Sequence, residues 1–583
     1  IMVDTGEHGT LCAGAAAATG FLWMVGTAPE AELIPVGNVY LTLWNFIMSY
    51  FYVVEGPDGI PNTGDEADIA SFSFGDSYIV NDGWDYESRL LEWIIKVYEA
   101  SYGENTVLLA STGNGGPGYG TVTEPGASYG TIGVGASSAF YVFDQLICGP
   151  GGLWCPRDAG NTNFMELASW SNRGPSATGS LGPHIVAIGM WDLGALPLWT
   201  GYYYAIWGGT SLSSPVAAGV TALAIQMYRE VLGDDYTAYD IRDILMSSAD
   251  DIGYDPLAMG AGMVNATKAV EAVGALFDPA LYIKSLVVKP AFAEFGVVKA
   301  GETYTKTLEV LGNITGLTVE DYVFELAKVE TRELTVNATQ IGEDGVSHYS
   351  RPDIAIVLPE EALNYDMIVV KMVIPLEQFD VDGDYYADIY PMLSVHEWVD
   401  VNGDGTWFND TNENGIYDYP EDWEDDEINI LMYDYAESNI MELTIGYPDM
   451  KVDKIGNAPR KIVIGFADYW APYYEGVVLY NVTIEVQYYR KVDNPHVTAT
   501  VGSDSIEVTL NLPDDVKPGL YYAMLKVRNA YGGEATVPVL YNVKVPLTFR
   551  GGYFGRDYLA PKVKILYDNE ALGADIDWWW RPD

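Results

Sequence analysis

The sequence predicts an α/β domain with a mostly parallel sheet over residues 1–277, followed by all-β sandwich domains. In the first part, apolar runs such as 106–111 alternate with segments of helical apolar spacing such as 84–102. Continuous apolar runs of this length are typical of parallel strands that are buried on both faces. After Phe277, period-two strands and Pro/Gly turns dominate, a pattern that is typical of antiparallel sandwiches.

Length and charge limit the class of protein. A chain of 583 residues is too long for a single core and therefore predicts several domains. Hydrophobic residues make up 49% of the chain, which excludes a wholly disordered protein. A net charge of -52 excludes nucleic acids and anionic membrane surfaces as main partners, and it favours bound cations. No apolar run is long enough to span a membrane.

In chain order, we expect a helix that begins at His8 and then strands that alternate with helices. The expected strands lie at 67–75, 106–111, 130–136 and 184–187. The expected helices lie at 84–102, from Pro215 onward, at 239–249 and at 266–273. The helix after Pro215 is rich in Ala and Gly, which predicts close packing against its neighbours. Alternation of this kind is typical of α/β folds.

The second part predicts two sandwich units. We place the first at 278–445 and the second at 446–550, on strand patterns such as 303–310, 505–510 and 520–527. An acidic insertion interrupts the first unit at about 378–428. Residues 551–583 are expected to begin a further, truncated β domain, because the aromatic end of the chain does not suit a solvated tail.

Cysteines and sequons carry less information. Three cysteines do not make a disulfide scaffold. Cys148 and Cys155 could close a small bridge, whereas Cys12 is expected to be a buried free thiol. Sequons are consistent with an exported glycoprotein, at the cell surface or outside the cell; they occur at Asn265, Asn313, Asn337, Asn409 and Asn481.

Three segments carry residues for acyl transfer to a serine hydroxyl. Residues 209–215 place Ser211 on a glycine-led turn that opens a helix of small residues. Residues 8–14 begin with His8, and residues 111–115 present Asn114 between glycines. A nucleophile, a general base and an oxyanion donor must lie within hydrogen-bond reach of one carbonyl. The three segments could supply these groups in the chain order base, donor, nucleophile.

These segments resemble the subtilisin-like serine proteases, the subtilase family, in sequence and in order. Further matches occur at 73–75, 168–175, 185–187 and 260–265, so that the resemblance covers about the first 275 residues. The acidic chain with its appended sandwiches looks most like the large extracellular pyrolysin and tripeptidyl-peptidase-like branch of that family. The resemblance implies a subtilisin-like catalytic domain that lacks its first strand segment, and polypeptide substrates.

The resemblance also implies roles for single residues. Ser211 would be the nucleophile, His8 the general base, and Asn114 the donor to the tetrahedral oxyanion. The helix that follows Ser211 would add partial positive charge near that oxyanion. Ser73, Phe74, Gly75, Gly113 and Gly116 would line the cleft, with the first three pairing with the peptide as an added strand.

The carboxylate that should orient His8 is not evident. The family carries it in an Asp-Ser/Thr-Gly turn that ends an early strand. Asp4 stands in such a turn but only four residues before His8, and too few residues precede it to build that strand. We therefore expect the carboxylate on an upstream segment, either an N-terminal fragment of the same precursor that was cleaved and stays bound, or a region that was not included. The alternatives are that Asp4 acts as the triad carboxylate and that the chain is an inactive relative.

The acidic insertion predicts bound Ca²⁺. Residues 410–421 fit the spacing of an EF-hand loop, with Gly415 at position 6. A second such loop begins at residue 400, and a third, without the glycine, begins at residue 380. Strands flank these loops, which favours a stabilising site. The expected ligands are Asp410, Asn412, Asn414, Asp418 and Glu421, then Asp400, Asn402 and Asp404, then Asp380, Asp382 and Asp384.

Two functions follow from these patterns. The first is a secreted, calcium-stabilised serine endopeptidase that forms an acyl-enzyme at Ser211; a tripeptidyl exopeptidase is a variant of it. The second is a catalytically inactive surface glycoprotein, derived from a protease, that acts in adhesion or assembly, for example in a cell-surface layer.

Overall fold

The computed structural model describes most of the chain between residues 6 and 543. The described residues are 6–20, 24–37, 43–75, 83, 85–103, 105–116, 119–138, 167–168, 170–176, 179–190, 192–338, 354–383, 387–399, 405, 408–409, 411, 423–424, 427–435, 439–445, 454–455, 458–468, 476 and 478–543. Within them, no helix is both long and apolar enough to cross a membrane.

A parallel sheet forms the centre of the first domain. Its strands β1 (Ile69–Phe72), β2 (Val107–Ser111), β3 (Ile132–Ser138) and β4 (Ile185–Met190) pair in this order. Every residue of β2 and β3 is buried, because both faces of a parallel sheet are covered. The four strands predicted from apolar runs are confirmed, with bounds that differ by a few residues.

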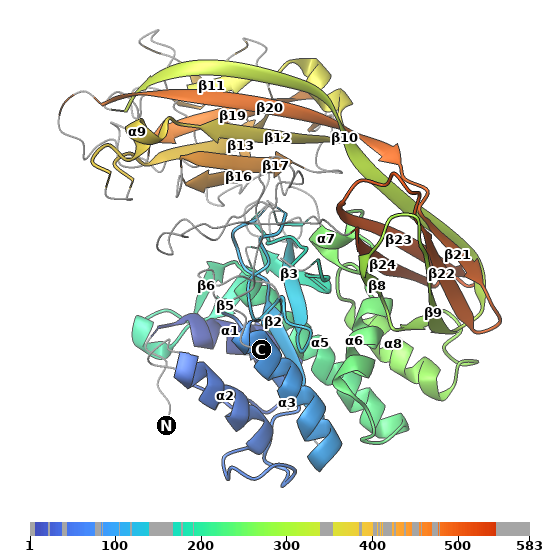
Figure 1. Ribbon diagram of the computed structural model, residues 1–583. Coiled ribbons are helices and arrows are strands. Elements are labelled where there is room, and N and C mark those ends of the chain that lie inside the picture. Colours follow the sequence, from blue (N-terminus) through green and yellow to red (C-terminus); the bar gives the residue numbers. More distant parts are fainter. Residues whose placement is uncertain are drawn as a thin grey trace.

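Helices cover the sheet (Figure 1). The first part of the domain contains α1 (His8–Ala17), α2 (Leu43–Glu55) and α3 (Tyr86–Tyr102); the second contains α5 (Thr210–Val231), α6 (Ala238–Ser247), α7 (Pro256–Met259) and α8 (Ala266–Phe277). The predicted helices at 84–102, 239–249 and 266–273 are confirmed. The sequence did not indicate α2, α7 or the hairpin of β5 (Asp192–Ala195) and β6 (Tyr204–Trp207), whose tip contains the short helix η3 (Leu198–Thr200).

Small residues let α5 approach α1, as its composition predicted. A Cβ atom on Gly219 would lie 2.5 Å from Cβ of Thr27 and 3.2 Å from the carbonyl oxygen of Ala16. On the α1 side, a Cβ atom on Gly14 would lie 3.0 Å from Cβ of Ala195 in β5. The helix that begins at His8 is therefore held between the long helix α5 and the β5–β6 hairpin.

The second half of the chain is mostly antiparallel β structure with two cores, although β24 and β8 pair in parallel. One core lies between a four-stranded sheet in the order β21-β22-β9-β7 and the part of a seven-stranded sheet that contains β23, β24 and β8. The other core lies between a five-stranded sheet, which contains β11-β19-β13-β16, and the part of the seven-stranded sheet in the order β17-β12-β20-β10. The long strand β10 (Ile314–Asn337) runs from one core to the other (Figure 1).

The strands of the two cores are interleaved along the sequence. In chain order they are β7 (Val287–Lys289), β8 (Ala293–Val298), β9 (Thr303–Leu311), β11 (Ile354–Val357), β12 (Met367–Val373), β13 (Pro391–Val399), β14 (Phe408–Asn409), β15 (Trp423–Glu424), β16 (Glu427–Tyr435), β17 (Ile440–Ile445), β18 (Lys454–Ile455), β19 (Ala458–Asp468), β20 (Leu479–Asp493), β21 (Val497–Val501), β22 (Ser505–Asn511), β23 (Gly519–Asn529) and β24 (Glu534–Val543). Two short helices, η4 (Glu360–Asn364) and α9 (Leu376–Phe379), lie between strands of this series.

This arrangement differs from the predicted division at residue 445. Strand β9 pairs with β22, which joins residues of the predicted first unit to residues of the predicted second unit. Strand β12 likewise pairs with β20. The two cores are interleaved in sequence because β10 leaves one core and β20 returns to it. The predicted domain at 551–583 lies outside the described residues.

Candidate functional site

Ser211 is the second residue of α5, so the helix begins one turn earlier than the sequence indicated. Gly209 precedes the helix with a φ of 139°, a backbone conformation that residues other than glycine rarely adopt. Its amide donates to the carbonyl of Gly189 at 2.7 Å, at the end of β4. The glycine turn therefore holds the nucleophile candidate beside the end of β4, at the N-terminus of a 22-residue helix.

Pro215 determines which groups gather at Ser211. In a regular helix, the amide of residue 215 would donate to the carbonyl of Ser211, but proline has no N–H group. Two side chains from distant segments donate to that carbonyl instead. The Ser73 hydroxyl donates at 2.8 Å and the Cys12 thiol at 3.4 Å. One carbonyl thus joins the segment after β1, helix α1 and the start of α5.

Asn114 is held beside Ser211 by the neighbouring threonine. Its Oδ1 accepts from the amide of Thr210 at 2.8 Å and from the Thr210 hydroxyl at 2.9 Å. The same hydroxyl accepts from the amide of Gly113 at 3.1 Å. Because Oδ1 is engaged on Thr210, the Nδ2 amide is the group that Asn114 can offer as a donor. A Cβ atom on Gly209 would lie 3.5 Å from Nδ2.

His8 is the first residue of α1 and is exposed. Its Nδ1 lies 3.8 Å from Sγ of Cys12, one turn along the helix. The imidazole also meets the ring of Trp207 edge to face, with 5.9 Å between the ring centroids. His8 and Ser211 therefore flank the same sulfur atom, although they lie more than 200 residues apart in the sequence.

Sequence reasoning did not assign positions to two residues beside His8. Cys12 was expected to be a buried free thiol; it is not in a disulfide, but it is only partly buried and contacts both His8 and the Ser211 carbonyl. Its position four residues after His8 is a signal that could have placed it on the same helix face. Trp207 comes from β6 and no local pattern indicates its contact with His8. Cys148 and Cys155 lie outside the described residues.

The predicted cleft residues lie on both sides of Ser211. Ser73 and Phe74 follow β1, and the Ser211 hydroxyl donates to the carbonyl of Ser73 at 3.3 Å. Phe74 stacks on Phe46 of α2 with 4.5 Å between centroids. Gly113 and Gly116 flank Asn114, and Gly75 is exposed beyond Phe74. Gly116 has no room for a side chain, because a Cβ atom there would lie 2.1 Å from the carbonyl oxygen of Ser171.

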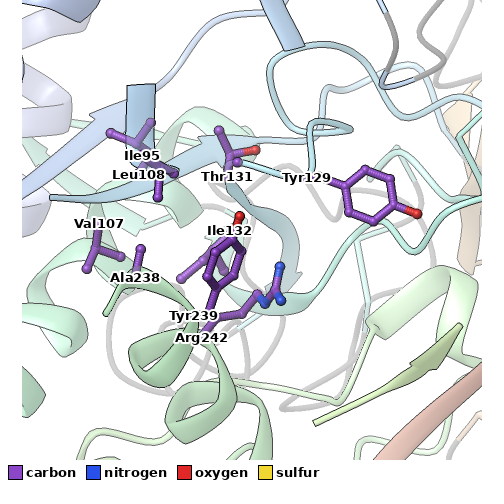
Figure 2. A pocket seen from close by; sticks show the side chains of 10 residues that line it. Ile95, Val107, Leu108, Tyr129, Thr131, Ile132, Ala238, Tyr239 and Arg242 are labelled. Carbon is purple, nitrogen blue, oxygen red and sulfur yellow. The ribbon is translucent and has the colours of Figure 1, made fainter. Parts of the chain in front are cut away.

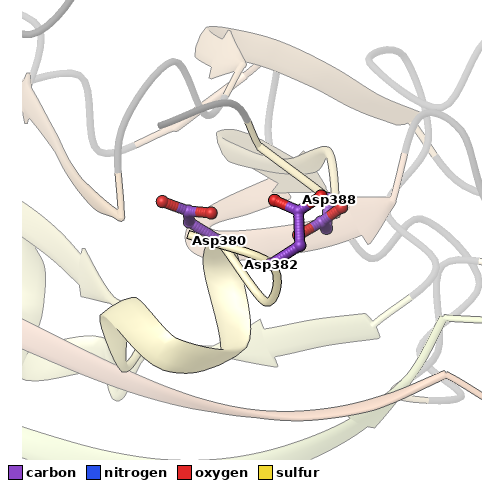
Figure 3. A group of neighbouring side chains, drawn as sticks. All are labelled: Asp380, Asp382 and Asp388. Carbon is purple, nitrogen blue, oxygen red and sulfur yellow. The ribbon is translucent and has the colours of Figure 1, made fainter. Parts of the chain in front are cut away.

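The described residues reach only part of the predicted metal and carboxylate sites. Asp4 lies outside them, as do Asp384 and all the ligands predicted at 400–404 and 410–421. Of the third set, Asp380 and Asp382 lie close to Asp388, with one carboxylate oxygen from each within 4.8 Å of the others (Figure 3). Asp380 accepts from the amide of Gly383 at 2.8 Å, and Asp388 accepts from the amide of Val381 at 2.6 Å. The arrangement folds a short acidic loop back on itself directly after α9.

Comparison with known proteins now gives the family. The sequence pattern of the subtilase family matches residues 2–270. Residues 2–270 are a subtilase domain. The sequence expectation of a subtilisin-like protease domain is confirmed.

Three relatives, two of which are named as a protease or a peptidase, match the chain over 46% of the chain's length. They are serine protease AprX of Bacillus subtilis (27% identical, 58% of its length covered), pyrolysin of Pyrococcus furiosus (28% identical, 19% covered) and tripeptidyl-peptidase 2 of Oryza sativa (29% identical, 19% covered). The chain therefore spans less than two thirds of the length of each of these relatives.

A pocket in the subtilase domain lies apart from the Ser211 site. Figure 2 shows it between α3, the β2–β3 part of the sheet and α6, with Tyr129, Tyr239 and Arg242 among its lining residues. The Arg242 guanidinium lies over the rings of Tyr239 and Phe292, at 4.9 and 4.8 Å. None of the three candidate catalytic side chains lines it. We assign it no part in acyl transfer.

Glu124 is a buried carboxyl group in the same domain. Its Oε1 accepts from the amide of Gly83 at 3.0 Å. Burial, and then the negative charge of Asp85, raise the pKa of Glu124 from an ordinary value of 4.5 to about 9. Between these two pH values the folded protein holds a proton that the unfolded chain releases. The free energy of unfolding therefore falls as the pH rises through this range.

We predict that Glu124→Gln makes the protein less sensitive to alkaline pH. The amide stays neutral, so the variant should gain about 2–4 kcal/mol of stability relative to the wild type between pH 5 and pH 8. Urea unfolding at several pH values measures this difference. Glu325→Gln, on the exposed surface of β10, is the control and should follow the wild type. A Glu124→Gln curve parallel to that of the wild type would contradict the prediction.

Proposed function

We propose that this protein is a serine endopeptidase that cleaves polypeptides through an acyl-enzyme at Ser211. The observation that carries the proposal is the meeting of three distant segments around Ser211. Its carbonyl binds Ser73 and Cys12, its neighbour Thr210 holds Asn114, and Cys12 contacts His8. The relatives that share the subtilase domain are named as proteases or peptidases, which supports the same reading.

Each group has a chemical role in this proposal. The imidazole of His8 takes the proton from the Ser211 hydroxyl as this oxygen attacks the substrate carbonyl, and returns it to the leaving amine. The hydroxyl donates to the Ser73 carbonyl in the structure, so it must rotate away when His8 accepts its proton. Negative charge then develops on the carbonyl oxygen. The Nδ2 amide of Asn114 and the N-terminus of α5 stabilise that charge.

The substrate would lie along Ser73–Gly75 as an added strand. These residues follow directly from β1, so an extended peptide beside them continues the direction of the sheet. Phe74 and the loop at Gly113 and Gly116 would then form the walls of the cleft. We further propose an extracellular or cell-surface location. The exposed sequon at Asn313, in the turn between β9 and β10, is in keeping with this location.

Labelling with a fluorophosphonate tests the nucleophile. The probe should attach to Ser211 in the wild type, and Ser211→Ala should abolish labelling. His8→Ala should slow it by several orders of magnitude, because the hydroxyl then lacks its base. Ser213→Ala is the matched control: Ser213 lies two residues further along α5 and is fully buried, so labelling should persist. Peptide mapping of the labelled protein identifies the serine. A folded wild type that takes no label would favour the inactive surface glycoprotein.

We propose that the carboxylate which orients His8 comes from an N-terminal segment of the same precursor, which binds as a further strand. Strand β1 ends the described parallel sheet, with β2 as its one partner there. A parallel strand beside β1 would end near the same edge of the sheet as Ser73. A carboxylate carried at that end would reach the His8 side of Ser211.

Asp4→Asn distinguishes this proposal from Asp4 as the triad carboxylate. If the carboxylate comes from the added strand, the rate of labelling at Ser211 should be the same for Asp4→Asn and for the wild type. Glu7→Gln, beside His8, is the control for a general change of charge. A loss of about 10⁴ in rate, confined to Asp4→Asn, would assign the carboxylate to Asp4 instead.

We also propose that the acidic insertion binds Ca²⁺ as a stabilising ion. The Asp380, Asp382 and Asp388 oxygens fit a single ion, because oxygens bound to one Ca²⁺ at 2.3–2.6 Å lie at most about 5.2 Å apart and these lie within 4.8 Å. The loops at 400–404 and 410–421 would supply further ligands. A divalent cation would also relieve the repulsion among the three carboxylates.

Removal of Ca²⁺ should lower the melting temperature. At a free concentration one hundred times the dissociation constant, an ion that binds only the folded state contributes about 2.7 kcal/mol. Asp388→Asn should reduce the rise in melting temperature on adding Ca²⁺ to a chelated sample. Asp504→Asn, an exposed acidic residue in the turn before β22, should leave that rise unchanged. Equal curves with Ca²⁺ and with chelator would contradict the proposal.

A further inference from the structure

Strand β23 has two apolar faces. Ala523, Leu525 and Val527 point into the sandwich core. The alternate residues pack against the subtilase domain instead. Tyr522 packs against the main core of that domain, and Met524 is buried in a cluster with residues of α7. Successive side chains of a strand point to opposite sides, so one strand serves both the sandwich and the subtilase domain. Figure 1 shows β23 beside α7.

The contact continues along the whole outward face of β23. At its start, a Cβ atom on Gly179 would lie 2.9 Å from the Leu520 side chain. Near its end, Lys526 forms an ion pair with Asp251. Apolar contacts and an ion pair along one strand thus connect the two parts of the chain.

Tyr522 lies at the centre of this face, in a cluster of buried polar groups. Its ring meets that of Tyr322 from β10 edge to face, with 5.7 Å between centroids. On the side of the subtilase domain, the Tyr119 hydroxyl donates to Oδ2 of Asp255 at 2.6 Å. Asp255 is 2% exposed. Burial, followed by the charges of Asp255 and Tyr119, raises the pKa of Tyr522 well above its usual range. Asp255 caps the N-terminus of α7, against which Met524 of the same face of β23 packs.

Tyr119 belongs to the loop that carries Asn114. Beyond the glycines, this loop is bound to residues 170–174 by backbone hydrogen bonds of 2.9 Å from Gly116, Gly120 and Thr121. The Arg173 guanidinium lies over the Tyr119 ring at 5.9 Å. The position of Tyr119 therefore fixes one end of the loop.

Asn172 connects this end of the loop to Asn114. Its Oδ1 accepts from the amide of Gly115 at 2.7 Å, and its Nδ2 donates to the carbonyl of Thr112 at 2.7 Å. These two bonds hold the chain on both sides of Asn114. A Cβ atom on Gly113 would lie 2.1 Å from Nδ2 of Asn172, so the two segments are in direct contact. A close-packed connection of this kind transmits small displacements.

We propose that the sandwich is a positioning element for the oxyanion donor, with Tyr522 and Tyr119 as positioning residues that act through Asn114. The proposal rests on the proposed function, because it says which residues hold the oxyanion donor of the same catalytic site in place. The face of β23 that carries Tyr522 packs against α7, whose N-cap residue Asp255 binds Tyr119. The backbone at Gly116 and at residues 120–121 is bonded to residues 170–174, and Asn172 fixes the backbone on both sides of Asn114.

The test compares two neighbouring tyrosines on opposite faces of β23. Tyr522→Leu removes the ring that packs on the subtilase domain from this face of β23. Tyr521→Leu is the matched control, because the Tyr521 ring stacks on Tyr541 inside the sandwich at 5.1 Å and so tests a general loss of sandwich stability. With a peptide substrate, Tyr522→Leu and Tyr119→Phe should lower kcat about 10-fold and leave KM unchanged, since small misplacements of catalytic groups cost rate. Tyr521→Leu should keep the kcat of the wild type.

A double-mutant cycle shows whether the effect passes through Asn114. In the Asn114→Ala background, Tyr522→Leu should have no further effect on kcat, because the donor that it displaces is gone. An unchanged 10-fold loss in that background, or an equal loss in Tyr521→Leu, would overturn the proposal.

Hydrogen exchange supplies a readout that does not depend on activity. The amides of residues 113–116 should exchange faster in Tyr522→Leu than in Tyr521→Leu or the wild type. Equal exchange in all three proteins would overturn the proposal even if the wild type is active. Faster exchange in Tyr522→Leu together with a wild type that neither labels nor cleaves would support the structural link and contradict the proposed peptidase function.

Discussion

The carbonyl of Ser211 is the group on which the site depends. Pro215 leaves this carbonyl without its helical donor, and a buried acceptor without a partner is costly. Ser73 and Cys12 donate to it instead. Ser73 follows β1 and Cys12 lies in α1. Because Pro215 has no N–H group, hydrogen bonds to the Ser211 carbonyl therefore connect three elements: the end of β1, α1 and the start of α5. His8 follows because it lies one helical turn before Cys12.

A second constraint acts from the opposite side of Ser211. Thr210 uses both its amide and its hydroxyl to hold Oδ1 of Asn114, which determines the direction of the Asn114 amide. The loop around Asn114 is in turn held by Asn172 and by glycines that allow no side chain. The start of α5 is thus bonded on one side to the His8 helix and on the other side to the Asn114 loop. Such preorganisation is what oxyanion stabilisation requires.

The sequence predicted those features that depend on local patterns. Buried apolar runs predicted the four parallel strands, and the order of the His8, Asn114 and Ser211 segments predicted one family. The helix α2 was missed because its sequence is apolar at most positions, and a short apolar run does not by itself distinguish a helix from a buried strand. The role of Pro215 follows from proline chemistry, so the sequence could have indicated it. The contact of Trp207 with His8 depends on how a hairpin packs on α1, and no local signal reports that.

The interleaved sandwiches mark the limit of prediction from local patterns. Strands β9 and β22 pair across almost 200 residues of intervening chain, and strand alternation does not say which partner a strand takes. The two-faced pattern of β23 is equally ambiguous, because a continuous apolar run such as 520–525 suits any strand that is covered on both sides. Here the second cover is the subtilase domain, which makes the sandwich part of the environment of the Asn114 loop.

The central claim is that His8, Asn114 and Ser211 act on one carbonyl, and the most direct test is a crystal structure of the protein after reaction with a small phosphonylating inhibitor. The account predicts a covalent bond from the Ser211 oxygen to phosphorus. It also predicts a phosphoryl oxygen within hydrogen-bond distance of Nδ2 of Asn114 and the His8 imidazole facing the modified serine. A phosphoryl oxygen directed away from Asn114, or phosphorus bound to another residue, would contradict the account.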